Sequence, residues 1–283
     1  MLEKVGNQFD IVHNHTYPEF INLLVADKLK VPILTTIHAQ MTSQLDEVLS
    51  QFNALKNCYF VSISHAHRKL VKKTKIWKVI QNGVDTDLYK FYPKKGNYLL
   101  WIGRLSKAKD KRGNFLDPKG VRWAIRLAKK TSSKLLLSGN VEDPEFFKRD
   151  VKPYLSSKIK WIGPVSFEQS LSKKKVAKLM QKARVFLMTV NWYEPFGLVM
   201  AESMSCGTPV IGFDRGSVSE LVVDGKTGFV VKPKEGIEGL KRALRKIDKI
   251  DPKDCRVHVE KNFSLEKMVT NYEKVYKEII NRK

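Results

Sequence analysis

The fold of this 283-residue chain is decided by the stretch Asn191-Trp-Tyr-Glu-Pro-Phe-Gly-Leu-Val-Met-Ala-Glu-Ser-Met-Ser-Cys-Gly-Thr-Pro-Val210. An apolar run typical of a strand precedes it at 184–190, and a second such run follows at 209–213. The small and apolar residues that begin at Gly197 indicate a helix between these strands. Strand, helix and strand in succession predict a parallel α/β sheet, whose ligands bind outside the carboxyl ends of the strands.

Two carboxylates and a helix start lie in this stretch. Glu194 lies on the loop after the first strand, and Glu202 lies about a turn and a half into the helix. The amides of Gly197 and Leu198 fall at the helix N-terminus, where backbone N–H groups have no helical partner and bind anions. This combination suits a nucleotide sugar, because amides can hold its diphosphate while carboxylates accept hydrogen bonds from sugar and ribose hydroxyls.

The sequence around these residues resembles a known family. The motif Glu194-Pro-Phe-Gly-Leu198, the following Glu202 and the segment Cys206–Val210 resemble the signature of family 4 retaining glycosyltransferases, which have the GT-B fold of two facing Rossmann-like domains. The resemblance continues through Gly216–Glu220 and Asp224–Phe229. An isolated Glu-Pro-Phe-Gly would also fit an ordinary strand-to-helix turn, but this motif has the strand and helix context that identifies it.

Strand patterns alternate with helix patterns along the whole chain. The expected strands are 9–13, 32–37, 59–63 and 77–80 in the first part, and 98–102, 134–137, 158–162, 184–190, 209–213 and 228–231 in the second. This alternation predicts an α/β fold with two doubly wound parallel-sheet domains. The resemblance implies that the N-terminal one is incomplete. We expect a partial acceptor-side domain at 1–93, a nucleotide-sugar-binding domain at 94–262, and a C-terminal helix at 263–283 that packs back on the N-terminal domain, as in relatives.

Local patterns predict individual helices. A helix is expected at 19–29, and Ser64 is most simply the N-cap of the helix that follows it. The segment Ser166-Phe-Glu-Gln169 has the spacing of a capping box and predicts a helix from there to about Ala183. Apolar residues from Leu265 to Ile279 recur at helical spacing and form one stripe on a long helix.

Composition excludes several classes of protein. A chain with 42% hydrophobic and 29% charged residues is typical of a globular protein. It has no apolar run of about 18 residues and no signal-peptide pattern at its start, so neither a transmembrane helix nor secretion is expected. Its three cysteines, Cys58, Cys206 and Cys255, lack metal-ligand spacing and fit a reducing cytoplasm.

The net charge of +23 is the most unusual property of the composition. Lysines scattered over solvated helix faces are its simplest explanation. Peripheral contact with the anionic inner face of a membrane is the alternative, because many relatives glycosylate lipid acceptors. Binding of nucleic acid is not expected, because no recognition motif or cluster of stacking aromatic residues accompanies the charge.

The resemblance implies a role for each residue of the motif. Glu194 contacts the donor sugar near the reacting centre, and Glu202 bridges the ribose hydroxyls. The amides of Phe196, Gly197 and Leu198 hold the diphosphate.

Two cations are expected to neutralise the departing diphosphate, which fixed charges can do in place of a metal. Arg104 follows an apolar strand, and Lys119 precedes the next helix. This pair resembles the Arg and Lys that contact the donor diphosphate in the family. The loop between them is longer than in the family pattern, so Lys107 or Lys109 is an alternative to Lys119. Arg104 as an ordinary surface cation is the other alternative.

The remaining candidates also rest on the resemblance. Thr35-Thr-Ile-His38 resembles the family's Thr-x-His near the donor sugar, which makes His38 a catalytic candidate; a loop histidine without a role is the alternative. His13-x-His15 better resembles a segment near the acceptor cleft than a metal site, because alternate residues of any strand point the same way. Gly139 and Ile162 match positions beside the nucleotide, although each fits a tight turn equally well. No metal or cofactor is expected.

Together these features predict a retaining glycosyltransferase of cell-envelope glycan biosynthesis. It would move a sugar from a UDP- or GDP-sugar to a hydroxyl of a glycan or lipid-linked saccharide in the cytoplasm. Retention of configuration is implied by the resemblance alone. A nucleotide-sugar epimerase or phosphorylase is a second interpretation, and a catalytically weak nucleotide-sugar-binding fragment, or one half of a split enzyme, is a third.

The start of the chain favours that last interpretation. Relatives have further strand-helix units before the Asp-x-x-His-x-His segment, which here begins at Asp10. Three units of about 30 residues each would be missing, roughly 90 residues in all. We therefore expect an open edge and one uncovered apolar face on the N-terminal sheet, with self-association or a partner chain at that edge.

Overall fold

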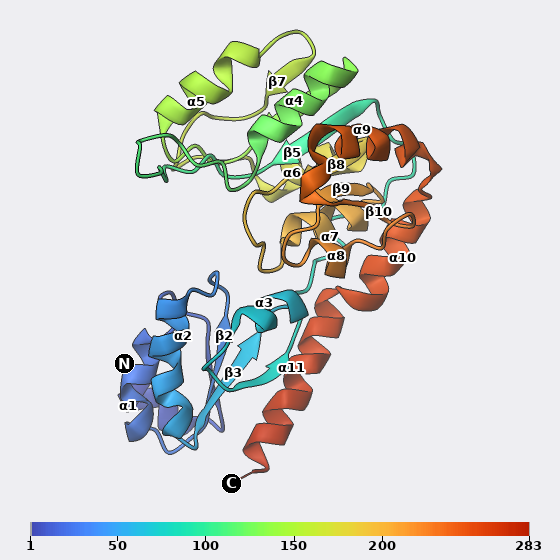
Figure 1. Cartoon of the computed structure of the whole chain (residues 1–283). Helices are drawn as coiled ribbons and strands as arrows, with labels where there is room; N and C mark the ends of the chain where they lie inside the picture. The colour runs from blue at the N-terminus through green and yellow to red at the C-terminus, as the bar shows by residue number, and fades with distance from the viewer. Residues whose placement is uncertain (1, 283) are drawn as a thin grey trace. The chain divides into compact units, whose positions relative to one another are not determined.

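The computed structural model describes residues 2–282 and divides into two compact units (Figure 1). Unit 1 contains the chain up to Gly83, the short segment Glu194–Phe196, and the chain from Leu265 onward. Unit 2 contains Val84–Tyr193 and Gly197–Ser264. The motif that runs from Glu194 to Glu202 is therefore divided, with Glu194 in unit 1 and Glu202 in unit 2.

Unit 1 is built on four parallel strands in the order β1-β2-β3-β4. Their bounds are Val12–Asn14 for β1, Ile33–Ile37 for β2, Cys58–Ser62 for β3 and Ile76–Val79 for β4. The register sets Val12 beside Ile33 and Ile33 beside Cys58. Each strand forms within or beside an apolar run that predicted one, although β1 begins three residues later than expected.

Both faces of this sheet carry a buried hydrophobic cluster. Ile33 and Ile37 of β2 pack on one face, while Leu34 between them packs on the other, as the alternation of side chains along a strand requires. The second face is covered by the long C-terminal helix α11 (Leu265–Ile280), which supplies Tyr272 and Val275 among other residues. The expectation of an uncovered apolar face is therefore wrong.

The other helices of unit 1 are short. They are α1 (Leu2–Val5), η1 (Gly6–Gln8), η2 (Ile21–Lys28), α2 (Ser43–Ser50), η3 (Gln51–Ala54) and α3 (His65–Leu70). The helix expected at 19–29 is present as the 3₁₀ helix η2. The N-cap predicted at Ser64 is confirmed, because its Oγ accepts a hydrogen bond from the amide of His67 at 2.8 Å.

Unit 2 contains a six-stranded parallel sheet in the order β10-β9-β8-β5-β6-β7. The strands are β5 (Tyr98–Ile102), β6 (Lys134–Ser138), β7 (Ile159–Trp161), β8 (Val185–Met188), β9 (Val210–Phe213) and β10 (Gly228–Val231). The chain runs outward from β5 to β7, then returns to the other side of β5 and continues to β10. Strand order therefore reverses between β5 and β8, which makes this the position where sheets of this kind bind ligands.

Helices surround this second sheet. They are α4 (Val121–Thr131), α5 (Pro144–Asp150), η4 (Lys152–Tyr154), α6 (Lys173–Lys182), α7 (Leu198–Ser205), α8 (Val218–Leu221), η5 (Pro233–Glu235), α9 (Gly236–Lys246), η6 (Ile247–Lys249) and α10 (Pro252–Asn262). α4 packs against α9, and α7 packs against α6 and α10. The α/β architecture with two parallel sheets agrees with the prediction from sequence.

The helix expected to start at Ser166 begins later. α6 starts at Lys173, and its N-cap is Ser172, whose Oγ accepts a hydrogen bond from the amide of Lys175. The Oγ of Ser166 instead accepts hydrogen bonds from two nearby amides in a local turn, and its carbonyl accepts one from the amide of Val141 at 3.1 Å. That long-range bond stabilises a non-helical backbone at Ser166, so the predicted start is wrong.

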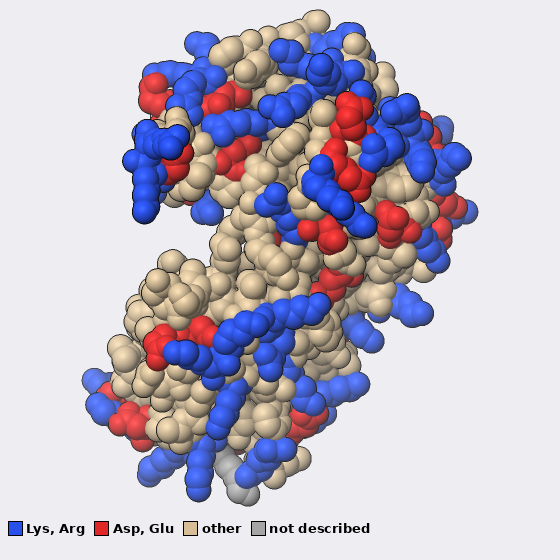
Figure 2. Space-filling model, viewed as in Figure 1, with Lys and Arg blue, Asp and Glu red and all other residues tan. Residues whose placement is uncertain are grey.

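Lys and Arg side chains are spread over the visible face of both units rather than gathered in one area (Figure 2). This distribution fits solvated helix faces, the simplest explanation of the net charge of +23. Within residues 2–282, no helix is long and apolar enough to cross a membrane.

Candidate active site

The strand reversal in unit 2 brings two sequence-predicted segments together at one edge of the sheet. Arg104 follows the carboxyl end of β5, and Gly197 is the N-cap of α7, the helix that follows β8. β5 and β8 are hydrogen-bonded neighbours, with Leu99 beside Val185. Because both strands are parallel, the segments that follow them lie at the same edge.

Arg104 is held in position by a carboxylate. Its Nη1 lies 3.1 Å from Oε1 of Glu142, whose side chain is only 11% exposed while that of Arg104 is half exposed. Glu142 is itself fixed, because its Oε2 accepts a hydrogen bond from the amide of Lys107 at 3.1 Å. The guanidinium is therefore oriented by a nearly buried partner and keeps an exposed side. Sequence reasoning missed Glu142, because no local pattern connects it to Arg104.

Lys119 lies at the start of α4 and is partly buried. Its Nζ lies 4.2 Å from the centroid of the Trp192 ring, and its carbonyl accepts a hydrogen bond from Nε1 of Trp101 at 3.0 Å. The alternative cation Lys109 is engaged elsewhere, with its Nζ 4.3 Å from the ring centroid of Phe115. The structure thus orients Lys119 at the α4 start and holds Lys109 against its own loop.

The N-termini of α4 and α7 differ in whether a side chain caps them. At α4, Asp117 is buried and accepts hydrogen bonds from the amides of Gly120, Val121 and Arg122 at 2.9–3.0 Å. Burial raises the pKa of Asp117, against the effect of these amides. Asp117 lies three residues before the N-cap Gly120, outside the N-cap position where an Asp is a sequence signal, so local pattern did not identify it. The amides at the start of α4 are therefore already occupied.

α7 lacks such a cap in the part of the chain that the structure describes. Gly197 stands at the N-cap position with φ 75° and ψ 62°, a left-handed conformation that favours glycine, and no side chain caps the helix. The preceding Phe196 is buried. The amides of Gly197 and Leu198 at the uncapped end form the kind of position where a phosphate binds.

Glu202 lies on α7, one turn from that end, and is paired with a phenol. Burial raises the pKa of Glu202, while a hydrogen bond from Tyr89 and the charge of Lys173 act in the opposite direction. The backbone of Tyr89 is held as well, because its carbonyl accepts hydrogen bonds from Oγ of Ser205 and from Arg256. Tyr89 therefore orients the carboxylate, a contact that the sequence analysis did not find.

Two further positions of unit 2 lie at the same carboxyl edge. Gly139 follows β6 with φ 143°, and a Cβ there would lie 1.8 Å from the carbonyl oxygen of Gly103, so only glycine fits. Ile162 follows β7, and its amide donates to the carbonyl of Leu137 at 2.7 Å. Both segments bring backbone close to the edge that carries Arg104.

In unit 1, the segment that contains Glu194 packs beside α3. The side chain of Glu194 is buried, and the carbonyl of Pro195 accepts a hydrogen bond from Oγ of Ser64 at 2.5 Å. Ser64 thus both caps α3 and anchors this segment.

The same unit contains an array of three hydrogen-bonded imidazoles. Nδ1 of His15 lies 2.9 Å from Nε2 of His38, and Nε2 of His15 lies 3.2 Å from Nδ1 of His13. His13 continues the array, with Nδ1 2.6 Å from the hydroxyl of Tyr276 and Nε2 2.8 Å from Oγ1 of Thr36. The array thus connects the catalytic candidate His38 to the C-terminal helix.

The three imidazoles are held neutral near pH 7. Burial, followed by the neighbouring imidazoles, lowers the pKa of His13 to about 3. Burial also lowers the pKa of His15 and of His38, although the buried carboxylate of Glu19 acts in the opposite direction on His38. Among residues 2–282, no group of three or more His, Cys, Asp or Glu side chains is arranged to hold a metal ion. The array is therefore a set of neutral donors and acceptors.

Comparison with known proteins identifies a family for each part of the chain. Residues 90–262 match the family model described as Glycosyl transferases group 1, and residues 2–88 match the one described as Glycosyltransferase Family 4. An uncharacterized glycosyltransferase of Methanocaldococcus jannaschii is 26% identical over 95% of this chain and 76% of its own length. The N-acetyl-alpha-D-glucosaminyl L-malate synthase of Bacillus anthracis is 25% identical over 96% of this chain and 75% of its own length.

Solved structures show the same fold. A sucrose-phosphate synthase from Thermosynechococcus elongatus superposes with a TM-score of 0.78 at 20% identity, over 98% of this chain and 75% of that one. HepE from Anabaena, solved with UDP and glucose, superposes with a TM-score of 0.77 at 18% identity, over 98% of this chain and 80% of the HepE chain. The expected GT-B fold is confirmed by these neighbours. With a family model that matches more than half of its length, this chain belongs to the glycosyl transferases group 1 family of glycosyltransferases.

Proposed function

We propose that this chain is a retaining glycosyltransferase that moves a sugar from a UDP- or GDP-sugar to a hydroxyl of a glycan or a lipid-linked saccharide. The observation that carries the proposal is the strand reversal in unit 2. It brings the oriented cation Arg104 and the uncapped N-terminus of α7 to one edge of the sheet, with Glu202 one turn further along α7. HepE, which shares the fold, was solved with UDP and glucose, and this supports a nucleotide-sugar donor.

Each group in unit 2 has a chemical task under this proposal. Arg104 and Lys119 neutralise the negative charge that develops on the departing diphosphate, and the amides of Phe196, Gly197 and Leu198 donate hydrogen bonds to it. Glu202, oriented by Tyr89, accepts hydrogen bonds from the ribose hydroxyls. The backbone at Gly139 and Ile162 adjoins the nucleoside.

The groups in unit 1 act on the sugar and on the acceptor. Glu194 contacts the donor sugar near the reacting carbon. His38, at the end of the imidazole array, donates a hydrogen bond to an oxygen of the donor sugar or of the acceptor substrate. A neutral array suits hydroxyl recognition, because each ring can donate one hydrogen bond and accept another.

The first experiment measures release of sugar from UDP- and GDP-sugars by the purified chain, with and without glycan acceptors. We expect release that Arg104→Ala lowers strongly, while removal of an exposed cation of α9 in Arg245→Ala leaves it unchanged. Nucleotide binding without turnover of any donor would instead support the alternative of a catalytically weak binding fragment or one half of a split enzyme. The anomeric configuration of the product, read by proton NMR, tests retention.

We also propose that donor binding needs no divalent metal, because fixed cations supply the charge. Calorimetric titration with UDP or GDP should give the same dissociation constant in EDTA as in Mg²⁺, within a factor of two. Binding that is lost in EDTA and restored by Mg²⁺ or Mn²⁺ would contradict the roles of Arg104 and Lys119.

A partner for the edge of unit 1 is part of the same proposal. Within the described residues, β1 is hydrogen-bonded to β2 alone, so its outer edge offers unpaired backbone groups to a second strand. Light scattering of the chain in solution tests self-association. Sedimentation with anionic vesicles tests peripheral contact with the inner face of a membrane, which the net charge of +23 supports.

A further inference from the structure

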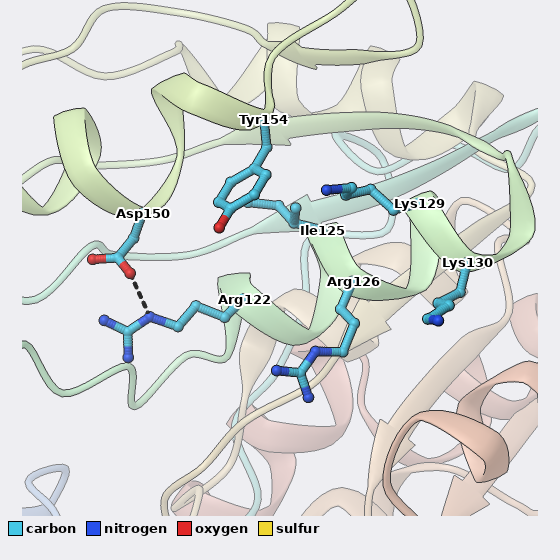
Figure 3. A pocket seen from close by; sticks show the side chains of 7 residues that line it. All are labelled: Arg122, Ile125, Arg126, Lys129, Lys130, Asp150 and Tyr154. Atoms are coloured by element: carbon cyan, nitrogen blue, oxygen red, sulfur yellow. Dashed lines mark hydrogen bonds and ion pairs between the residues drawn. The ribbon is translucent and has the colours of Figure 1, made fainter.

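A second candidate binding site lies in unit 2, on the outward side of α4. A cavity of about 520 Å³ lies there between α4 and the segment that ends in η4 (Figure 3). It is lined by Arg122, Ile125, Arg126, Lys129, Lys130, Asp150 and Tyr154. None of these residues has a role in the donor site proposed above.

Most of the charged side chains that line this cavity are positive. The four cations on α4 stand at positions i, i+4, i+7 and i+8 and therefore share a helix face. The single carboxylate that lines the cavity, Asp150, is already shared by Arg122 and Arg149, at 2.8 and 3.0 Å. In the described part of the chain, no carboxylate lies within ion-pair distance of Arg126, Lys129 or Lys130. The lining thus has an excess of positive charge that the protein does not neutralise.

Three of the four cations are positioned by neighbouring groups. Arg122 donates from Nε to Asp150 and from Nη2 to the carbonyl of Phe115 at 3.1 Å. The guanidinium of Arg126 lies 4.9 Å from the ring centroid of Trp123, and Nζ of Lys129 lies 4.9 Å from that of Tyr154. Cations held in this way lose less conformational freedom when they bind an anion than freely moving side chains do.

A solvated helix face is the simpler explanation and accounts for only part of the pattern. Lys129 and Lys130 lie in the last turn of α4, where a cation interacts favourably with the helix dipole. Arg122 lies in the first turn, where the dipole disfavours a cation, and it is nevertheless fixed with its guanidinium beside the cavity (Figure 3). Like charges four residues apart, as in Arg122 and Arg126, also destabilise a helix. A bound anion would offset both costs.

We propose that this cavity binds a ligand that carries a phosphate or diphosphate group, at a site separate from the donor nucleotide. Arg126, Lys129 and Lys130 contact the phosphate oxygens, and Arg122 adds an oriented guanidinium. Ile125 and the partly exposed ring of Tyr154 contact the non-phosphate part of the ligand. The volume suits a small phosphate ester or the headgroup of a phospholipid.

The test uses lysine acetylation of the full chain, read by mass spectrometry of peptides, with inorganic pyrophosphate as the probe. Pyrophosphate should slow the acetylation of Lys129 and Lys130 at least fivefold. Lys174 and Lys175, exposed cations on α6, are the control in the same sample and should react at an unchanged rate. This local readout is independent of any pyrophosphate bound at the donor site.

Paired variants decide whether the cavity is responsible. In R126A/K130A, protection of Lys129 should fall to less than a third of the wild-type value. The matched variant K174A/K175A removes the same charge from another helix and should keep full protection. Equal protection of Lys129 in both variants, or none in the wild-type chain, overturns the proposal.

The same acetylation experiment with lipid vesicles distinguishes a phospholipid headgroup from a soluble phosphate ester as the source of the phosphate. Vesicles of phosphatidylcholine with phosphatidic acid should protect Lys129 and Lys130 if the ligand is a phospholipid headgroup, and vesicles of phosphatidylcholine alone should not. Protection by pyrophosphate without protection by either vesicle assigns the site to a soluble phosphate ester.

Discussion

Unit 1 and unit 2 are parallel sheets of similar construction, but the polar groups at their carboxyl edges differ in charge. In unit 2 the edge carries the oriented cation Arg104, the uncapped amides of α7 and the carboxylate of Glu202. In unit 1 the corresponding groups are neutral imidazoles, with His15 beside His38 at 2.9 Å. Under the proposed function, this difference corresponds to a division of roles, in which unit 2 binds the charged part of a nucleotide sugar and unit 1 recognises uncharged hydroxyls.

The two carboxylates of the shared motif make this comparison testable, because Glu194 packs in unit 1 and Glu202 in unit 2. The largest effect is expected from Glu194→Gln, which keeps the shape of a buried side chain and removes its charge. Transfer should fall by a factor of about 100 or more, because an electrostatic contact at the reacting centre is lost. Steady-state kinetics with the identified donor measures this loss.

Nucleotide affinity provides the control for that variant. Glu194→Gln should leave the dissociation constant of UDP or GDP within a factor of about two of the wild-type value. The loss of an interaction made only in the transition state slows transfer without weakening nucleotide binding. Loss of nucleotide binding in Glu194→Gln would assign this residue to the nucleotide and break the proposed division of work.

Glu202→Ala should give the opposite pattern. We expect the dissociation constant of the nucleotide to rise about 10- to 100-fold, because hydrogen bonds to a charged group contribute about 1.5–3 kcal/mol. Calorimetry measures the change, and Glu238→Ala, which removes an exposed carboxylate of α9, is the matched control. Tyr89→Phe keeps the carboxylate and removes the group that orients it, so its effect should be smaller. Unchanged affinity in Glu202→Ala would show that the ribose contact lies elsewhere.

A smaller effect is expected from the neutral array of unit 1. The pKa of His13 in the folded protein is about 3, far below its usual 6.5, so the unfolded chain binds a proton first as the pH falls. The folded state is therefore favoured above pH 6.5 and loses stability progressively below it. Between pH 6.5 and 5 this loss should be about 1 kcal/mol for His13, after a discount for the part of the ring that solvent reaches.

Urea unfolding at pH 6.5 and pH 5 measures this dependence. His13→Gln cannot titrate and should show a stability that changes less over the interval than that of the wild-type chain. His65→Gln, which removes an exposed imidazole of α3, is the control and should keep the wild-type dependence. Equal pH dependence in His13→Gln and wild type would contradict the buried, neutral state of this ring.

The sequence predicted what depends on local pattern. Apolar runs located every strand to within a few residues, and the motif after β8 placed Gly197 at the start of α7. Local sequence pattern could not predict contacts between segments that are distant in the chain. His13 and Tyr276 are 263 positions apart and meet because α11 packs on the first sheet. The pairs Arg104–Glu142 and Glu202–Tyr89 likewise depend on how loops converge at a sheet edge.

Helix starts show where local pattern and tertiary structure compete. Ser64 was predicted as an N-cap and is one, and it is buried and bonded to the segment of Glu194 as well. Ser166 has the better capping-box spacing, yet its carbonyl pairs with the amide of Val141, and the helix starts after Ser172. In this segment the long-range hydrogen bond at Ser166 accompanies a non-helical backbone, and the second serine, Ser172, caps the helix instead.

Alanine substitutions at the three serines, which change only stability, test this comparison of helix starts. Ser64→Ala should destabilise the protein most, by about 2 kcal/mol, because it removes a buried cap that also donates to the carbonyl of Pro195. Ser172→Ala should cost about 1 kcal/mol, the usual effect of losing an exposed cap. Ser166→Ala should cost less than half of that, since its hydroxyl serves only a local turn. Urea midpoints followed by circular dichroism give the order, and a larger cost at Ser166 than at Ser172 would place the start of α6 where the capping-box pattern predicted it.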